Sequence, residues 1–115
     1  MTPLTYALTL LSVAMICLGQ VLFKLVGLRL HEGAAPTSLR AGGVLVGAFA
    51  LYGLATLLWV YVLRTAPLTR AYPFMALSFV LVPLAGVYLF SEPVRPQYLA
   101  GVVLILAGVV LTVRP

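Results

Sequence analysis

Residues 66–79, which read APLTRAYPFMALSF, join two long apolar segments and form the most polar junction of the chain. Pro67 and Pro73 bracket its polar part, and Arg70 and Tyr72 stand at the mouth of the apolar segment that follows. An arginine and a tyrosine at the rim of an apolar helix are typical of the boundary between water and lipid. The junction therefore predicts a turn at a membrane surface, with a membrane-spanning helix on either side of it.

The composition of the whole chain also indicates a membrane protein. Of its 115 residues, 63% are apolar and 8% are charged, which is too little charge to cover the surface of a soluble domain. The net charge of +5 favours anionic headgroups or an anionic substrate as partners, rather than nucleic acid. With one cysteine, Cys17, and one histidine, His31, we expect no disulfide, metal or other cofactor.

Four apolar segments are long enough to span the membrane, since about 20 helical residues cross a hydrocarbon core of about 30 Å. We expect a single all-α transmembrane domain over residues 1–115, with helices over residues 4–28, 41–63, 71–90 and 97–113. Residues 29–40 are expected to form a loop that contains the turn-forming Gly33 and Pro36. An even number of spans places both termini and the junction at 64–70 on one side of the membrane.

The basic residues are shared almost evenly between the two sides of this arrangement. One side carries Arg64, Arg70 and Arg114, and the other carries Lys24, Arg29, Arg40 and Arg95. The positive-inside rule therefore assigns no orientation.

Glycine pairs indicate where helices approach one another closely. Gly43 and Gly47 form a small-xxx-small pair in the second span. Gly101 and Gly108, seven residues apart, lie on one face of the fourth span. We interpret the second pair as the seam of a dimer, with contact inside one subunit as the alternative.

Pro83 falls in the middle of the third span. Proline removes one backbone hydrogen bond and frees the carbonyl of Phe79, four residues earlier. At this depth the freed carbonyl must be satisfied by a neighbour or by water that lines a cavity. A packing kink and a functional hinge are both consistent with this position.

Ser12, Ile16, Gln20 and Lys24 recur every four residues and form one stripe along the first helix. An unpaired amide is costly near mid-span, so Gln20 is expected to face protein or a water-filled cavity. It either bonds a neighbouring helix or lines a polar path with Lys24. In the second case Lys24 supplies the charge for an anionic headgroup, whereas the alternative for Lys24 is a snorkelling anchor.

Three residues near the 66–79 junction are candidates for substrate contacts. Arg70 and Tyr72 are suited to binding a phosphate near the interface, and the alternative is that they anchor the helix. Trp59 and Tyr72 either stack on a sugar or mark the interface.

Glu92 lies just beyond the third span, where it is expected to pair with Arg95 or to stabilise the N-terminus of the fourth helix. The chain's other carboxylate, Glu32, also falls in an expected loop. The sequence therefore places no acid inside the membrane and contains no set of nucleophile, base and acid, so an enzyme is not expected.

Three short motifs resemble those of a known family, and the resemblance covers nearly the whole chain. They are Gly-Gln followed by Lys (Gly19, Gln20, Lys24), Ala-Tyr-Pro (Ala71, Tyr72, Pro73) and Glu-Pro-Val (Glu92, Pro93, Val94). The chain resembles the EamA-like proteins of the drug/metabolite transporter superfamily, in the short four-helix form of the small multidrug resistance proteins. Within that group it is most similar to subunits of the flippase for undecaprenyl-phosphate-linked 4-amino-4-deoxy-L-arabinose.

The resemblance implies a dimer in the bacterial inner membrane, with a substrate chamber between two four-helix subunits. The dimer is either a homodimer or a heterodimer with a paralogous four-helix subunit. The implied substrate is an anionic polyprenyl-phosphate lipid whose sugar serves lipid A or envelope modification. We expect it to be bound by Gln20, Lys24, Trp59, Arg70 and Tyr72, while Pro83 and Glu92 have structural roles.

Two other functions are alternatives. The first is a small multidrug resistance-type exporter of cationic compounds. Drug-exporting relatives place an essential glutamate in the first helix, where this chain has Ile16, and this difference argues against proton-coupled drug export. The second is a non-transporting accessory subunit that binds another membrane protein through its glycine faces.

Overall fold

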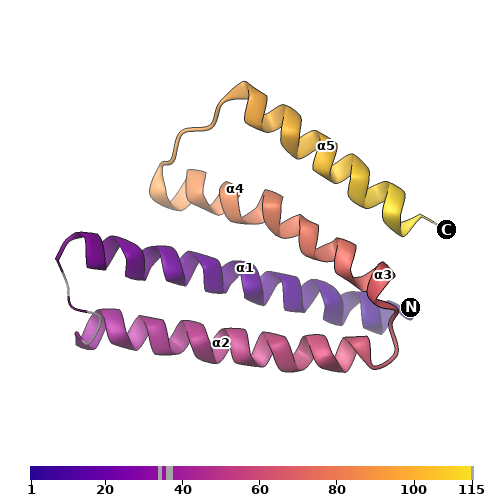
Figure 1. The fold of residues 1–115 in the computed structure, drawn as a ribbon, viewed down its shortest axis with the longest axis horizontal. Coiled ribbons are helices and arrows are strands. Elements are labelled where there is room, and N and C mark those ends of the chain that lie inside the picture. The colour runs from indigo at the N-terminus through magenta and orange to yellow at the C-terminus, as the bar shows by residue number, and fades with distance from the viewer. Residues whose placement is uncertain (34, 36–37, 115) are drawn as a thin grey trace.

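The first two helices form an antiparallel pair in the computed structural model, which describes residues 1–33, 35 and 38–114 (Figure 1). Helix α1 runs over Pro3–His31, and the hydroxyl of Thr2 caps it by accepting a hydrogen bond from the Thr5 amide at 3.2 Å. Helix α2 runs over Leu39–Leu63, and Ser38 caps it in the same way through the Ala41 amide at 3.3 Å. Both caps satisfy amides that have no partner within the helix.

Helix α1 extends beyond the end expected at residue 28, so the prediction of a loop from Arg29 is wrong for its first three residues. Arg29 and His31 lie in the last turn, where positive charge is favourable beside the helix C-terminus. The helix ends before Gly33, whose φ of 96° lies in a region that glycine adopts readily. Pro36, the other residue expected in this turn, lies outside the described residues.

The third span is a continuous helical path over residues 68–90 in three parts. They are helix α3 (Leu68–Ala71), the 3₁₀-helix η1 (Tyr72–Leu77) and helix α4 (Ser78–Phe90). The path begins three residues before the expected start, because the Pro67 carbonyl accepts hydrogen bonds from the amides of Arg70 and Ala71, at 3.1 and 3.0 Å. Pro73, which has no amide to donate, lies at the start of the 3₁₀ part.

The fourth span is helix α5 (Pro96–Val113), with Pro96 in its first turn. It packs mainly against η1 and touches α4 less (Figure 1). None of its residues, all of which the structure describes, is buried. Most of the surface of α5 is therefore available to lipid or to another chain.

Small residues spaced by seven form the interface between α1 and α2. On α2 the buried residues are Ala41, Ala48, Ala55 and Val62, and on α1 they include Ser12, Gly19 and Val26. Small side chains let two helices approach closely, and packing contacts then hold them together in a solvent as apolar as their own surfaces. The buried hydroxyls of Thr9 and Ser12 donate to carbonyls of their own helix, at 2.7 and 3.0 Å.

Gly43 and Gly47 lie away from this interface. Both are exposed, and a Cβ atom built on either would meet no atom within 4 Å among the described residues. Two residues turn a helix by about 200°, so Gly43 faces away from the side on which Ala41 is buried. Any close helix approach at this glycine pair is therefore to another chain, and that contact stays a prediction.

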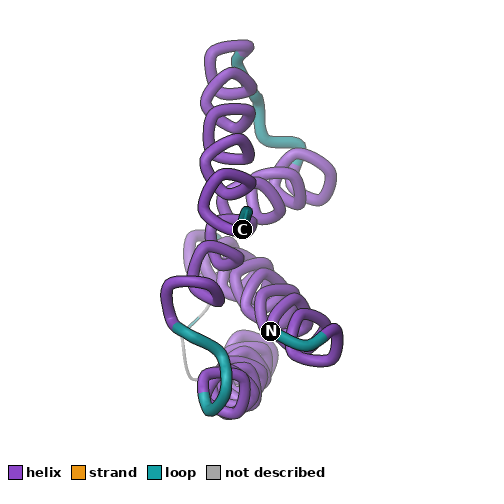
Figure 2. The backbone as a smooth tube through the Cα atoms, turned by 90° about the vertical axis from the view of Figure 1, so that its right-hand side faces the viewer, coloured by secondary structure: helices purple, strands orange, loops and turns teal. Residues whose placement is uncertain are grey.

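The helices lie in a flat layer, with extents of 50 × 37 × 16 Å. The N-terminus and the end of α5 lie at the same end of the layer, together with the turn between α2 and α3 (Figures 1 and 2). Large apolar side chains are exposed on every one of the four spans. The four helices are each long and apolar enough to cross a membrane.

Candidate functional site

A cavity of about 980 Å³ lies between α1, α4, the 91–95 loop and the first turn of α5. Its polar lining comes from α1 (Gln20 and Lys24), the loop (Glu92 and Arg95) and the first turn of α5 (Gln97 and Tyr98). Apolar residues of α4, among them Pro83 and Phe90, line another part of it. The cavity thus combines charged groups with an apolar wall, which is the usual make-up of a ligand site.

Lys24 and Glu92 form an ion pair across this cavity, with 3.7 Å between Nζ and Oε1. Both side chains are about half exposed, at 47% each. The carboxylate of Glu92 turns back toward α1, so its partner in the structure is Lys24 and not the expected Arg95. Two charges that are half exposed attract each other weakly, so the pair can open at little cost.

The backbone around Ser91 directs Glu92 toward Lys24. Ser91 adopts a left-handed conformation, with φ of 54°, which ends α4 and reverses the chain. The Glu92 amide then donates to the Gly86 carbonyl at 3.3 Å. A Cβ on Gly86 would lie 2.8 Å from Glu92 Oε2, so the missing side chain makes room for the carboxylate.

Gln20 bonds a neighbouring helix, which is one of the two expected roles, and it also lines the large cavity, while its part in a polar path for a substrate stays a prediction. Its amide nitrogen donates a hydrogen bond to the hydroxyl of Tyr52 on α2, and its side chain also lines the cavity. The Tyr52 ring stacks on Phe23, with centroids 5.2 Å apart, and lies against the backbone of Gly19. Gly19 therefore provides the space that lets Tyr52 reach Gln20.

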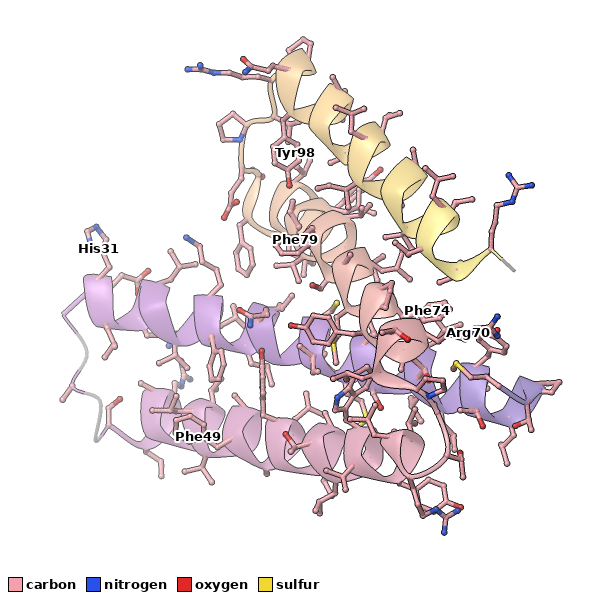
Figure 3. The ribbon with its side chains drawn as sticks, turned by 45° about the vertical axis from the view of Figure 1, so that its right-hand side comes forward. His31, Phe49, Arg70, Phe74, Phe79 and Tyr98 are labelled. Carbon is pink, nitrogen blue, oxygen red and sulfur yellow. The ribbon has the colours of Figure 1, made fainter. Side chains whose placement is uncertain are left out.

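The carbonyl that Pro83 frees has a partner from another helix. The hydroxyl of Tyr98, on α5, donates to the Phe79 carbonyl at 3.4 Å, so of the two expected partners, a neighbour or water, the structure shows a neighbour. Figure 3 shows Tyr98 pointing from α5 toward Phe79. A second cavity of about 290 Å³ adjoins this contact and shares Gln20, Pro83 and Tyr98 with the first.

The remaining expected site residues lie at the opposite end of the layer. Trp59 packs against a buried cluster near Leu8 of α1, and its ring lies 6.5 Å from that of Tyr72. Lys24 is 16 residues farther along α1 than Leu8, a separation of about 24 Å at a rise of about 1.5 Å per residue. Figure 3 likewise shows Arg70 at the end away from His31. The structure thus brings Gln20 and Lys24 together and leaves Trp59, Arg70 and Tyr72 outside the large cavity.

Three residues of the site were not expected there. The sequence gives Arg95 a place as a basic residue beside Glu92, but it gives neither Tyr98 nor Tyr52 a role in the site. For Tyr98 a signal existed, because a hydroxyl in the first turn of a helix that follows a proline-broken span is a ready donor. For Tyr52 and Arg95 the sequence carries no comparable signal.

A sequence model of the EamA-like transporter family matches residues 1–114. The chain belongs to this family. A relative from Pseudomonas savastanoi pv. phaseolicola is 38% identical over 92% of this chain and 94% of its own length. Another, from Enterobacter sp. (strain 638), is 33% identical over 94% of this chain and 95% of its own. A third, from Shigella flexneri serotype 5b, is 47% identical over 56% of this chain and 58% of its own.

All three relatives are named as probable 4-amino-4-deoxy-L-arabinose-phosphoundecaprenol flippase subunits. No solved structure shows significant similarity to the chain. The family and these relatives confirm the resemblance found in the sequence, and they make the chain a transporter-family protein rather than an enzyme. Together with the four long apolar helices, they make it a multi-pass membrane protein.

Proposed function

We propose that the chain is one subunit of a transporter that moves an anionic polyprenyl-phosphate-linked sugar between the leaflets of the bacterial inner membrane. The names of its relatives support this function and suggest 4-amino-4-deoxy-L-arabinose as the sugar. The observation that carries the proposal is the cavity in which Lys24 and Arg95 lie beside an apolar wall.

The headgroup is the part of such a lipid that resists transfer, because a charged phosphate is costly to place in about 30 Å of hydrocarbon. In the proposed mechanism Lys24 and Arg95 hold the phosphate, and Gln20 offers a hydrogen bond to the phosphate or the sugar. The polyprenyl tail stays in lipid along the exposed apolar side chains of α4, such as Leu84 and Leu89. The cavity volume of about 980 Å³ is at the upper end of the usual range for small-ligand sites.

Arg70, Tyr72 and Trp59 have a different place in this mechanism. Arg70 is half-buried at the opposite end of the layer, where Tyr72 is exposed and packs edge-on against Trp59. We assign these residues to a second position of the headgroup, reached after it has left the cavity. Arg70 would then meet the phosphate at the other membrane surface.

An exporter of cationic compounds is not favoured. The large cavity does contain a carboxylate, Glu92, but two basic residues, Lys24 and Arg95, share it. The formal charge of these three groups is +1, which disfavours a cation and favours an anion.

The exposed faces of α5 further suggest that the subunit works in a homodimer or with a paralogous four-helix subunit.

Replacing Lys24 with alanine tests the proposed function. We expect Lys24→Ala to abolish binding of a short-chain polyprenyl-phosphate sugar, measured by calorimetry on the purified protein, while the dimer stays intact. Arg29→Ala is the matched control, because Arg29 is an exposed basic residue of the same helix outside the cavity. Unchanged binding in Lys24→Ala, or preferential binding of a quaternary ammonium compound by the wild-type protein, would contradict the proposal.

A further inference from the structure

We infer that Glu92 binds the ammonium group of a zwitterionic headgroup, so that the cavity selects a lipid whose phosphate-linked sugar carries an amine. This inference rests on the proposed function and adds to it a residue that determines specificity. It starts from the charges that the cavity contains: Lys24 and Arg95 are positive and Glu92 is negative.

The ion pair between Lys24 and Glu92 occupies the place that such a headgroup would take. Its 3.7 Å separation is longer than a charge-assisted hydrogen bond, and both side chains are 47% exposed. A phosphate that approaches Lys24 therefore competes with a weakly held carboxylate. Before the lipid binds, Glu92 neutralises Lys24, and in the complex with the lipid the phosphate takes over that role.

The displaced carboxylate then needs a new partner. A lipid with a phosphate and a neutral sugar brings one negative charge. When Lys24 and Arg95 both hold that phosphate, Glu92 is left without the cation with which it pairs in the structure and lies near a second anion. A lipid with an amino sugar brings a phosphate and an ammonium group together. The phosphate is then shared by Lys24 and Arg95 while the ammonium pairs with Glu92, so neither anionic group is left without a cation.

The position of Glu92 is set by its surroundings rather than by Lys24 alone. The left-handed Ser91 and the hydrogen bond from the Glu92 amide to the Gly86 carbonyl hold its backbone. The carboxylate lies in the space above Gly86, which has no side chain to exclude it. Glu92 therefore stays at the cavity wall when its bond to Lys24 opens.

The test compares two lipids that differ by one charge: a short-chain polyprenyl phosphate bearing a 4-amino sugar, and the same lipid with its amine acetylated. We expect the purified wild-type protein to bind the amino lipid about tenfold more tightly than the acetylated one. In Glu92→Gln this preference should fall to about parity, mainly through weaker binding of the amino lipid. Glu32→Gln is the matched control, because it removes the chain's other carboxylate, which does not line the cavity.

Gly86→Ala provides a second variant that keeps every charge. Its new Cβ would displace the Glu92 carboxylate from its place above residue 86, so we expect it too to reduce the preference for the amino lipid. An equal affinity of the wild-type protein for both lipids would overturn the inference and leave the proposed function standing. The inference would also be overturned if Glu92→Gln kept the preference for the amino lipid, or if that variant lost affinity for both lipids equally. Binding of neither lipid by the wild-type protein would overturn both proposals.

Discussion

Two glycines position the polar groups of the large cavity, and both do so by providing space. The ring of Tyr52 fills the space at Gly19, and the carboxylate of Glu92 fills the space at Gly86. Each of these partners then bonds a cavity residue of α1, since Tyr52 accepts from Gln20 and Glu92 pairs with Lys24. The polar stripe of α1 is thus held from α2 on one side and from the end of α4 on the other.

The space at Gly19 leads to a prediction about stability. A Cβ at this position would lie 2.5 Å from the Tyr52 ring, which is too close for any real contact. The stacked ring has little freedom to move, so we expect Gly19→Ala to lower the free energy of unfolding in detergent micelles by about 1–3 kcal/mol. Gly53→Ala is the control, because a Cβ there meets no atom within 4 Å in the described part of the chain. An equal effect of the two variants would show that the contact with Tyr52 is not tight.

The cavity residues differ in how far the sequence could predict them. Gln20 and Lys24 were predictable, because spacing by four along a helix depends on the helix alone. Their partners depend on which residues of other helices stand opposite, and packing decides this. A left-handed backbone is predicted from sequence mainly at glycine, and residue 91 is a serine. The conformation of Ser91 that directs Glu92 to Lys24 therefore could not be predicted.

At the scale of the elements, the length and apolarity of the four segments predict four membrane-spanning helices, but they do not predict which face of each helix packs against its neighbours. The glycine pair at Gly43 and Gly47 predicted close helix approach on one side of α2, whereas the buried residues Ala41 and Ala48 lie on another side. Alanine is too common in apolar helices for its seven-residue spacing to stand out in a sequence. The sequence was equally uninformative about the division of the third span into α3, η1 and α4, although Pro73, at the start of η1, weakens the regular helical bonding there.

The link between α4 and α5 can be tested through the carbonyl that Pro83 frees. Tyr98→Phe removes the hydroxyl that donates to Phe79, and we expect it to lower the free energy of unfolding by about 0.5–1.5 kcal/mol. The 3.4 Å length of the bond favours the lower part of this range. Pro83→Ala restores an amide donor for the same carbonyl, so Tyr98→Phe should cost less in that background.

The double-mutant cycle between Tyr98 and Pro83 therefore isolates the interaction, measured by denaturant titration in micelles. Tyr88→Phe is the control, because Tyr88 is 78% exposed and lies on α4, the helix that contains Pro83. Purely additive effects of Tyr98→Phe and Pro83→Ala would mean that the two helices are not joined by this bond.

At the scale of the whole molecule, the layer is only 16 Å deep, and α5 has no buried residue along its described length. A cavity bounded by such a layer needs lipid or a second subunit to complete its walls. Gly101 and Gly108 give α5 a narrow face on which a helix of another chain can pack closely. A Cβ at either glycine meets no atom within 4 Å among the residues that the structure describes, so the packing of those residues does not explain why both positions lack a side chain.

We expect two subunits to associate through this glycine face of α5. Leucine at both positions, Gly101→Leu with Gly108→Leu, should weaken association about tenfold while leaving the subunit folded, because the added side chains clash only with a partner. Energy transfer between fluorescently tagged subunits in native membranes measures this association, and Gly53→Leu controls for an added leucine on an exposed helix face. If association survived this change but fell in Gly43→Leu with Gly47→Leu, the seam would lie on α2, and the cavity between α1, α4 and α5 would open to lipid rather than to a partner.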